Sequence, residues 1–114
     1  MYNLSLTQSL IPAQTDDIVR EITVGGLLRE TAAAHAQKTA LVEVGMMGEI
    51  GRSFSYGQLL AQAESLALAL STRYAQGERI CVWAPNIPEW LLMEYACALA
   101  GLVLVTATHL LQVH

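Results

Sequence analysis

The clearest succession of apolar and polar stretches in this chain lies at 77–106. A short apolar run at 79–84 is rich in strand-forming residues, and Pro85 ends it because proline has no amide hydrogen for a β-ladder. Helical character continues to about Ala100, and 102–106 is a second run that is apolar on both faces. Apolar strands on either side of a helix predict a right-handed βαβ crossover, whose buried parallel sheet is covered on both faces.

Capping residues predict the ends of the helix in this unit. Asn86 fits an N-cap, and Glu89 follows three residues later as a capping box requires, with a charge that suits the positive end of a helix. Pro88 is compatible with the first turn, because the amides there have no partner within the helix. Gly101 can adopt the left-handed conformation that ends a helix.

An earlier helix is predicted from Thr23, its N-cap, to about Gln37. One face carries five residues at helical spacing: Leu27, Leu28, Thr31, Ala32 and His35. Gly25 and Gly26 weaken the first turn by up to ~1 kcal/mol each relative to alanine. His35 is expected to pack on the core or at its rim rather than to bind a ligand, because no partner residue is spaced for it.

A β-hairpin is predicted next, from a strand at 39–44 and a returning strand at 52–55. Gly45, Gly48 and Gly51 lie around the connection, so a phosphate-binding loop is the competing interpretation. No Gly-Lys-Ser/Thr follows them, and no helix N-terminus is placed to receive an anion. The glycines therefore indicate a strand-to-strand turn.

A further amphipathic helix is predicted from Ser55 to near Tyr74. Ser55 and Gln58 have the spacing of a capping box. The apolar stripe consists of Leu59, Ala63, Leu66 and Leu70, widened by Leu60 and Ala67, whereas Gln58, Gln62 and Ser65 face away from it. Such a helix is expected to lie on a sheet.

These elements fit one small α/β domain, since 114 residues allow a single core. Residues 1–22 show no sustained period and predict an extended lead-in. The α/β elements occupy 23–107, and 108–114 departs from the pattern as a tail.

The composition is unusually apolar for so short a chain, with 54% hydrophobic residues and a mean hydropathy of +0.40. A well-buried α/β protein is one interpretation, and a piece of a larger protein whose apolar faces need neighbours is the favoured one. The formal net charge is −4 and the six basic residues are scattered, so nucleic-acid binding has no electrostatic support.

Candidate chemistry is sparse. Cys81 and Cys97 have no close-spaced motif or neighbouring histidine, so both are expected to be buried apolar cysteines in a reducing compartment rather than a disulfide or metal pair. His109 and His114 are expected to belong to an arbitrary tail rather than to a ligand set. No nucleophile elbow, paired carboxylates or metal-ligand spacing occurs, so no catalytic, cofactor-binding or metal-binding residue is assigned.

One stretch, 90–111, is long enough to span a membrane and has Glu94 as its one charged residue. The caps and the switch to β-branched residues after Gly101 argue against a single spanning helix, so no membrane partner is expected. A membrane-anchored peptide through 90–111 remains an alternative. No basic residue precedes Arg20, so neither a secretory signal nor an arginine-rich transit peptide is expected.

Three motifs in order carry a resemblance to a known family: Phe54-Ser55-Tyr56-Gly57-Gln58-Leu59-Leu60, then Gly77-Glu78-Arg79-Ile80-Cys81-Val82-Trp83-Ala84-Pro85-Asn86-Ile87-Pro88-Glu89-Trp90, then Ala98-Leu99-Ala100-Gly101-Leu102-Val103-Leu104-Val105. Together they resemble the start of the AMP-binding, acyl-adenylate-forming synthetases, most of all the fatty-acyl-CoA synthetases of medium- or long-chain type. The match covers about 23–107, and implies a partial N-terminal subdomain of the AMP-binding fold, with a βαβ crossover, a β-hairpin and flanking helices.

The resemblance implies an activity for the full-length family. Such enzymes join a carboxylate to ATP to form an acyl-adenylate, with magnesium assisting, and then form a thioester with coenzyme A. The family's phosphate loop, Thr-Glu motif, ribose-binding Asp and C-terminal lysine have no counterpart here, so this chain is expected to bind no ATP, Mg or coenzyme A and to be inactive alone.

The sequence departs from the family after 107, where Asn-Pro usually follows the second strand. A truncation, a frameshift or an alternative exon is the expected cause. The expected partner is the missing remainder of the synthetase or another chain that covers the apolar faces, with fatty acid bound only by the full-length enzyme. A small α/β interaction module without catalysis is the alternative function. The expected location is intracellular and cytoplasmic, with a mitochondrial one left open.

Overall fold

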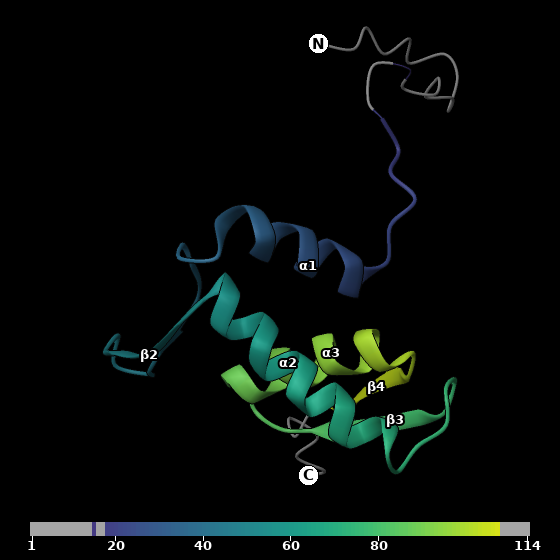
Figure 1. Ribbon diagram of the computed structural model, residues 1–114. Coiled ribbons are helices and arrows are strands. Elements are labelled where there is room, and N and C mark those ends of the chain that lie inside the picture. The colour runs from purple at the N-terminus through teal and green to yellow at the C-terminus, as the bar shows by residue number, and fades with distance from the viewer. Residues whose placement is uncertain (1–14, 16–17, 108–114) are drawn as a thin grey trace, which may run out of the picture.

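The computed structural model describes residue 15 and residues 18–107 (Figure 1). The elements are α1 (Val24–His35), β1 (Thr39–Val44), β2 (Ile50–Ser55), α2 (Tyr56–Ser71), β3 (Arg79–Trp83), α3 (Pro88–Ala100) and β4 (Val103–Ala107). Most of the predicted lead-in, and all of the predicted tail with His109 and His114, lie outside the described residues. The division of the chain at 22 and 107 stays a prediction.

Two small sheets lie at opposite ends of α2 (Figure 1). β1 and β2 pair as an antiparallel hairpin, in which Val44 lies opposite Ile50. β3 and β4 pair in parallel across α3, with Arg79 opposite Val103. The predicted hairpin and the parallel βαβ pairing are therefore confirmed, and the fold class is α/β.

Side chains cap the first two helices as predicted. The Thr23 hydroxyl oxygen accepts a hydrogen bond from the Gly26 amide at 3.0 Å. At α2, the Ser55 Oγ accepts from the Gln58 amide at 3.2 Å, and the Gln58 Oε1 accepts from the Ser55 amide at 2.9 Å. This reciprocal capping box satisfies two amides that have no partner inside the helix. Both helices end slightly earlier than predicted, at His35 and Ser71.

The predicted N-cap of α3 at Asn86 is wrong. Ile87 occupies that position, with extended backbone and no side-chain cap hydrogen bond, and Pro88 is the first helical residue. The residue before a proline is sterically disfavoured in the helical region, so Ile87 cannot begin the helix and the cap moves one position along. The other end follows the prediction, because Gly101 has a φ of 70° and its amide donates to the Cys97 carbonyl.

Two buried clusters form the core. Leu28, Leu59 and Ala63 join α1 to α2. The second cluster brings α2, α3 and the start of β4 together through Ala67, Leu70, Ala96, Cys97 and Leu102. Leu99 packs against both clusters, so α3 connects them.

Gly25 lies on the packed face of α1, at the contact with α3. A Cβ atom at Gly25 would come within 2.8 Å of Leu99 Cδ2, so a side chain at this position would force the Leu99 side chain to shift. Leu28 and Ala32 share this buried face as predicted. Leu27 and His35 are exposed, so the predicted face was too wide.

The prediction that the parallel sheet is covered on both faces is wrong for the described residues. Ile80 and Leu104 point to the core. On the other face Trp83 is 74% exposed, and Val103 and Val105 of β4 are also exposed. We call this surface the open face of the β3–β4 pair. An apolar run shows that a strand is suited to burial on both faces. Whether a second layer covers the outer face depends on residues outside that strand.

The described residues contain no helix that is both long enough and apolar enough to cross a membrane. Within 90–107, α3 ends at Ala100 and β4 begins at Val103, so this part of the chain does not form the single helix that the membrane-anchored alternative requires.

Candidate functional site

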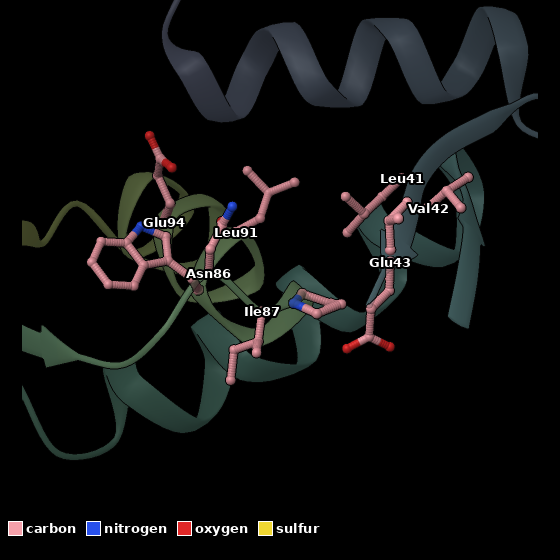
Figure 2. Close-up of a pocket in the computed structure, with 10 residues that line it drawn as sticks. Leu41, Val42, Glu43, Asn86, Ile87, Leu91 and Glu94 are labelled. Carbon is pink, nitrogen blue, oxygen red and sulfur yellow. The ribbon is translucent and has the colours of Figure 1, made fainter. Parts of the chain in front are cut away.

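A groove of about 470 Å³ lies between the hairpin and the first turns of α3. Its lining residues come from two segments, 41–44 of β1 and 86–94 around the start of α3: Leu41, Val42, Glu43, Val44, Asn86, Ile87, Pro88, Trp90, Leu91 and Glu94. Figure 2 shows Leu41 and Leu91 on opposite sides of it. The Glu43 and Glu94 carboxylates point in opposite directions, away from one another (Figure 2).

Arg52 holds the hairpin side of the groove to α3. Its guanidinium donates to Glu43 on the paired strand, from Nε to Oε2 at 2.8 Å and from Nη2 to Oε1 at 2.9 Å. The same guanidinium donates to Glu89 in the first turn of α3, with Nη2 at 3.0 Å from Oε2. We call these three residues the Arg52 cluster. Because the guanidinium makes two hydrogen bonds to the Glu43 carboxylate, it fixes the relative orientation of the two side chains as well as their distance, which a single hydrogen bond does not.

These contacts shift the acidity of all three groups. Hydrogen bonds from the Arg52 side chain and backbone lower the pKa of Glu43 from 4.5 to about 2. A hydrogen bond from Arg52 also lowers the pKa of Glu89. Hydrogen bonds to Glu43 and then Glu89 raise the pKa of Arg52 further above its ordinary value. The cluster is therefore fully ionised at neutral pH, with both carboxylates occupied by one cation.

The groove does not fit ATP or its magnesium ion. It is lined by two carboxylates and no basic side chain, so it would repel a triphosphate. Within the described residues no group of three or more His, Cys, Asp or Glu side chains gathers to hold a metal ion. Glu43 is engaged by Arg52, and no nucleophile lines the groove. Its chemistry suits packing against another segment rather than catalysis.

The cysteines, the histidine and the glycines that the sequence singled out do not come together in one site. Cys97 is buried as predicted, and burial raises the pKa of its thiol. Cys81 is exposed, so the prediction of burial was wrong for it, because it lies on the open face of the β3–β4 pair. His35 is exposed at the end of α1. Gly45 and Gly48 lie in the hairpin connection, whereas Gly51 lies in β2, which begins at Ile50, two residues earlier than predicted.

The Arg52 cluster is the arrangement that sequence reasoning missed. Glu43 and Arg52 fall in the two predicted hairpin strands, and opposite charges across a hairpin are a recognisable signal. Glu89 was assigned to a capping box instead, and its partner is Arg52, 37 positions away. Nothing local in the sequence connects those two positions.

Comparison with known proteins gives a consistent result. The model of the AMP-binding enzyme family matches residues 28–114. The mitochondrial medium-chain acyl-CoA ligase ACSF2 of Danio rerio is 29% identical over 102 residues, which cover 89% of this chain and 16% of that protein. The ACSF2 of Pongo abelii is 36% identical over 85 residues, which cover 74% of this chain and 13% of that protein.

Solved structures agree with these relatives. A Mycobacterium tuberculosis fatty acyl CoA synthetase superposes with a TM-score of 0.66 at 27% identity, over 78% of this chain and 17% of that one. The N-terminal domain of FACL13 from the same organism gives 0.64 at 26% identity, over 75% of this chain and 21% of that one. Because the family model matches residues 28–114, which are most of the chain, this chain belongs to the AMP-binding enzyme family.

Proposed function

We propose that this chain forms an N-terminal part of an AMP-forming fatty-acyl-CoA synthetase. The whole enzyme would join a fatty acid to ATP, release pyrophosphate, and pass the acyl group from AMP to coenzyme A. The observation that carries the proposal is the match of residues 28–114 to the AMP-binding enzyme family, and the fatty-acyl class is supported by the medium-chain acyl-CoA ligase relatives. The chain spans 13–16% of the length of the ACSF2 relatives above, so the activity belongs to a larger protein.

The part described here would act as scaffold. Its groove has no basic side chain among its lining residues to pair with a phosphate, and we propose that ATP, Mg and coenzyme A are held by other segments of the synthetase. The open face of the β3–β4 pair would receive the remainder of that domain, because parallel strands are stable when both faces are covered. An intracellular location is proposed, and the ACSF2 relatives, which are named as mitochondrial, favour mitochondria.

The catalytic part of the proposal is tested by ATP–pyrophosphate exchange. The purified chain alone is expected to give no exchange with medium- or long-chain fatty acids. Residues 28–107 of this chain, placed in the Danio rerio ligase instead of its matching segment, are expected to support exchange and thioester formation. The ligase with that segment deleted is the control. Exchange by the chain alone, or a folded chimera without exchange, would overturn the scaffold role.

A small α/β interaction module without catalysis is the second candidate, and the exposed Trp83 on the open face of the β3–β4 pair favours it. If the chain is such a module, the isolated chain is expected to be monodisperse and to melt cooperatively. The scaffold proposal instead expects self-association through the open face.

A further inference from the structure

The end of β4 brings the chain to one side of the groove between the hairpin and α3. β3 and β4 are parallel, and Ala107, the last residue of β4, lies opposite Trp83, the last residue of β3. Adjacent strands are about 4.8 Å apart, and the groove residue Asn86 follows Trp83 by three positions, which span at most about 10 Å. The sequence that follows Ala107 therefore starts within about 15 Å of the groove.

The hairpin side of the groove is the free edge of a strand. The lining residues of β1, 41–44, are consecutive, whereas successive side chains of a strand point to opposite faces. A groove that touches all of them therefore runs along the edge of β1. No residue of β2 lines it, so β2 pairs with the opposite edge, and among the described residues no further strand pairs with β1. The unpaired backbone groups of such an edge are a template for one more extended segment.

The walls of the groove are aliphatic and acidic. Leu41 and Leu91 lie on opposite sides of it (Figure 2). Glu43 is held by Arg52, whereas Glu94 is exposed and makes no ion pair with any described residue. An occupant that complements these walls carries aliphatic side chains and a nitrogen donor for the Glu94 carboxylate.

Seven residues follow β4 in the sequence: Thr108, His109, Leu110, Leu111, Gln112, Val113 and His114. An extended segment of this length reaches about 23 Å, which is more than the distance to the groove. Alternate residues of an extended segment share a side, so His109, Leu111 and Val113 would form one row. That row offers an imidazole N–H donor and two aliphatic side chains, which matches the free carboxylate and the two leucines of the groove.

We propose that residues 108–114 dock in the groove as a third strand on the free edge of β1, with the His109 imidazole donating to the Glu94 carboxylate. The occupant belongs to the same chain as the groove, so this goes beyond the proposed function and does not depend on it. It also differs from the expectation of an arbitrary tail. That expectation rested on sequence spacing, which does not register partners that lie much earlier in the chain.

Disulfide trapping tests the proposal in the full chain. In a Cys81→Ser background, His109→Cys and Glu94→Cys replace the two proposed partners by thiols. Mild oxidation is expected to join them within one chain, as identified by peptide mass spectrometry, and Cys97 does not compete because it is buried. His109→Cys with Leu68→Cys is the matched control, since Leu68 is 71% exposed on α2 and does not line the groove. Its disulfide yield is expected to be several-fold lower.

An independent readout uses Trp90, which lines the groove. In a Trp83→Phe background, Leu111→Asp is expected to shift the fluorescence of Trp90 to longer wavelength, because a charge at position 111 keeps the tail out of the groove and admits water. Leu68→Asp is expected to leave the emission unchanged. Equal disulfide yields at positions 94 and 68 overturn the proposal, as does the same emission in Leu111→Asp and its parent. A disulfide between two chains rather than within one also overturns it and assigns the groove to a second copy.

Discussion

Arg52 connects the separate parts of this structure through one side chain. It lies on β2, and its partners Glu43 and Glu89 lie on β1 and in the first turn of α3. All three side chains are substantially solvent-accessible, so water and salt screen their attraction, and the cluster contributes little to the free energy of folding. The main effect of the cluster is therefore directional, since it sets how the hairpin stands against α3 and so shapes the groove.

The titration of Glu43 tests this arrangement. Its pKa is lowered from 4.5 to about 2 by Arg52, so its contribution to stability is present above pH 4.5 and is lost as pH falls toward 2. Arg52→Met is expected to return the Glu43 pKa toward 4.5, as followed by carboxyl ¹³C chemical shifts. Arg29→Met breaks the separate pair with Glu64 and is expected to leave Glu43 unchanged. A Glu43 titration that is the same in Arg52→Met and wild type would show that the cluster does not form in solution.

The Arg52 cluster also marks the limit of sequence reasoning at this scale. Glu43 and Arg52 were placed in neighbouring strands, but a hairpin register with two irregularities decides whether they meet. Glu89 was placed in the correct turn with the wrong partner. The contacts that shape the groove are long-range in sequence, and local patterns do not determine them.

At the scale of elements, the predictions that held rest on local chemistry. Thr23, the Ser55–Gln58 capping box and Gly101 each satisfy backbone groups within a few residues, so sequence spacing alone identifies them. Asn86 is not the cap for an equally local reason, namely the steric effect of Pro88 on the residue before it.

Removal of the α2 capping box gives a direct measure of one such signal. Ser55→Ala is expected to lower the free energy of unfolding by about 1 kcal/mol, because the Gln58 amide loses its acceptor. Urea denaturation monitored by circular dichroism measures the change. Ser65→Ala, on the exposed face of the same helix, is expected to change stability by less than about 0.5 kcal/mol. Equal effects of the two substitutions would count against a role for the cap.

At the scale of the whole molecule, the composition pointed to apolar faces in need of neighbours, and the open face of the β3–β4 pair is such a surface. The sequence did not reveal that the core divides into two clusters joined by Leu99. That division depends on how three helices cross, which hydrophobic periodicity leaves undetermined.

Leu99→Ala tests the connection between the clusters. We expect it to lower the free energy of unfolding by about 2 kcal/mol, at the lower end for leucine because the side chain is only partly buried. Amide exchange is expected to speed up in both α1 and the C-terminal half of α2, since Leu99 contacts both clusters. Leu68→Ala, at an exposed position, is the control and is expected to have little effect. Faster exchange in one cluster alone would mean that the clusters are independent.

The parallel pairing of Arg79 with Val103 imposes an order on the assembly of this chain. Hairpin residues Val44 and Ile50 meet after a short loop closes, whereas β3 meets β4 only after all of α3 has folded back between them. Closing that larger loop costs conformational entropy, and this cost comes before the hydrogen bonds between β3 and β4 can stabilise the chain. The hairpin and its helix are therefore expected to form first and the parallel ladder late, with its apolar strands exposed to other chains in the meantime.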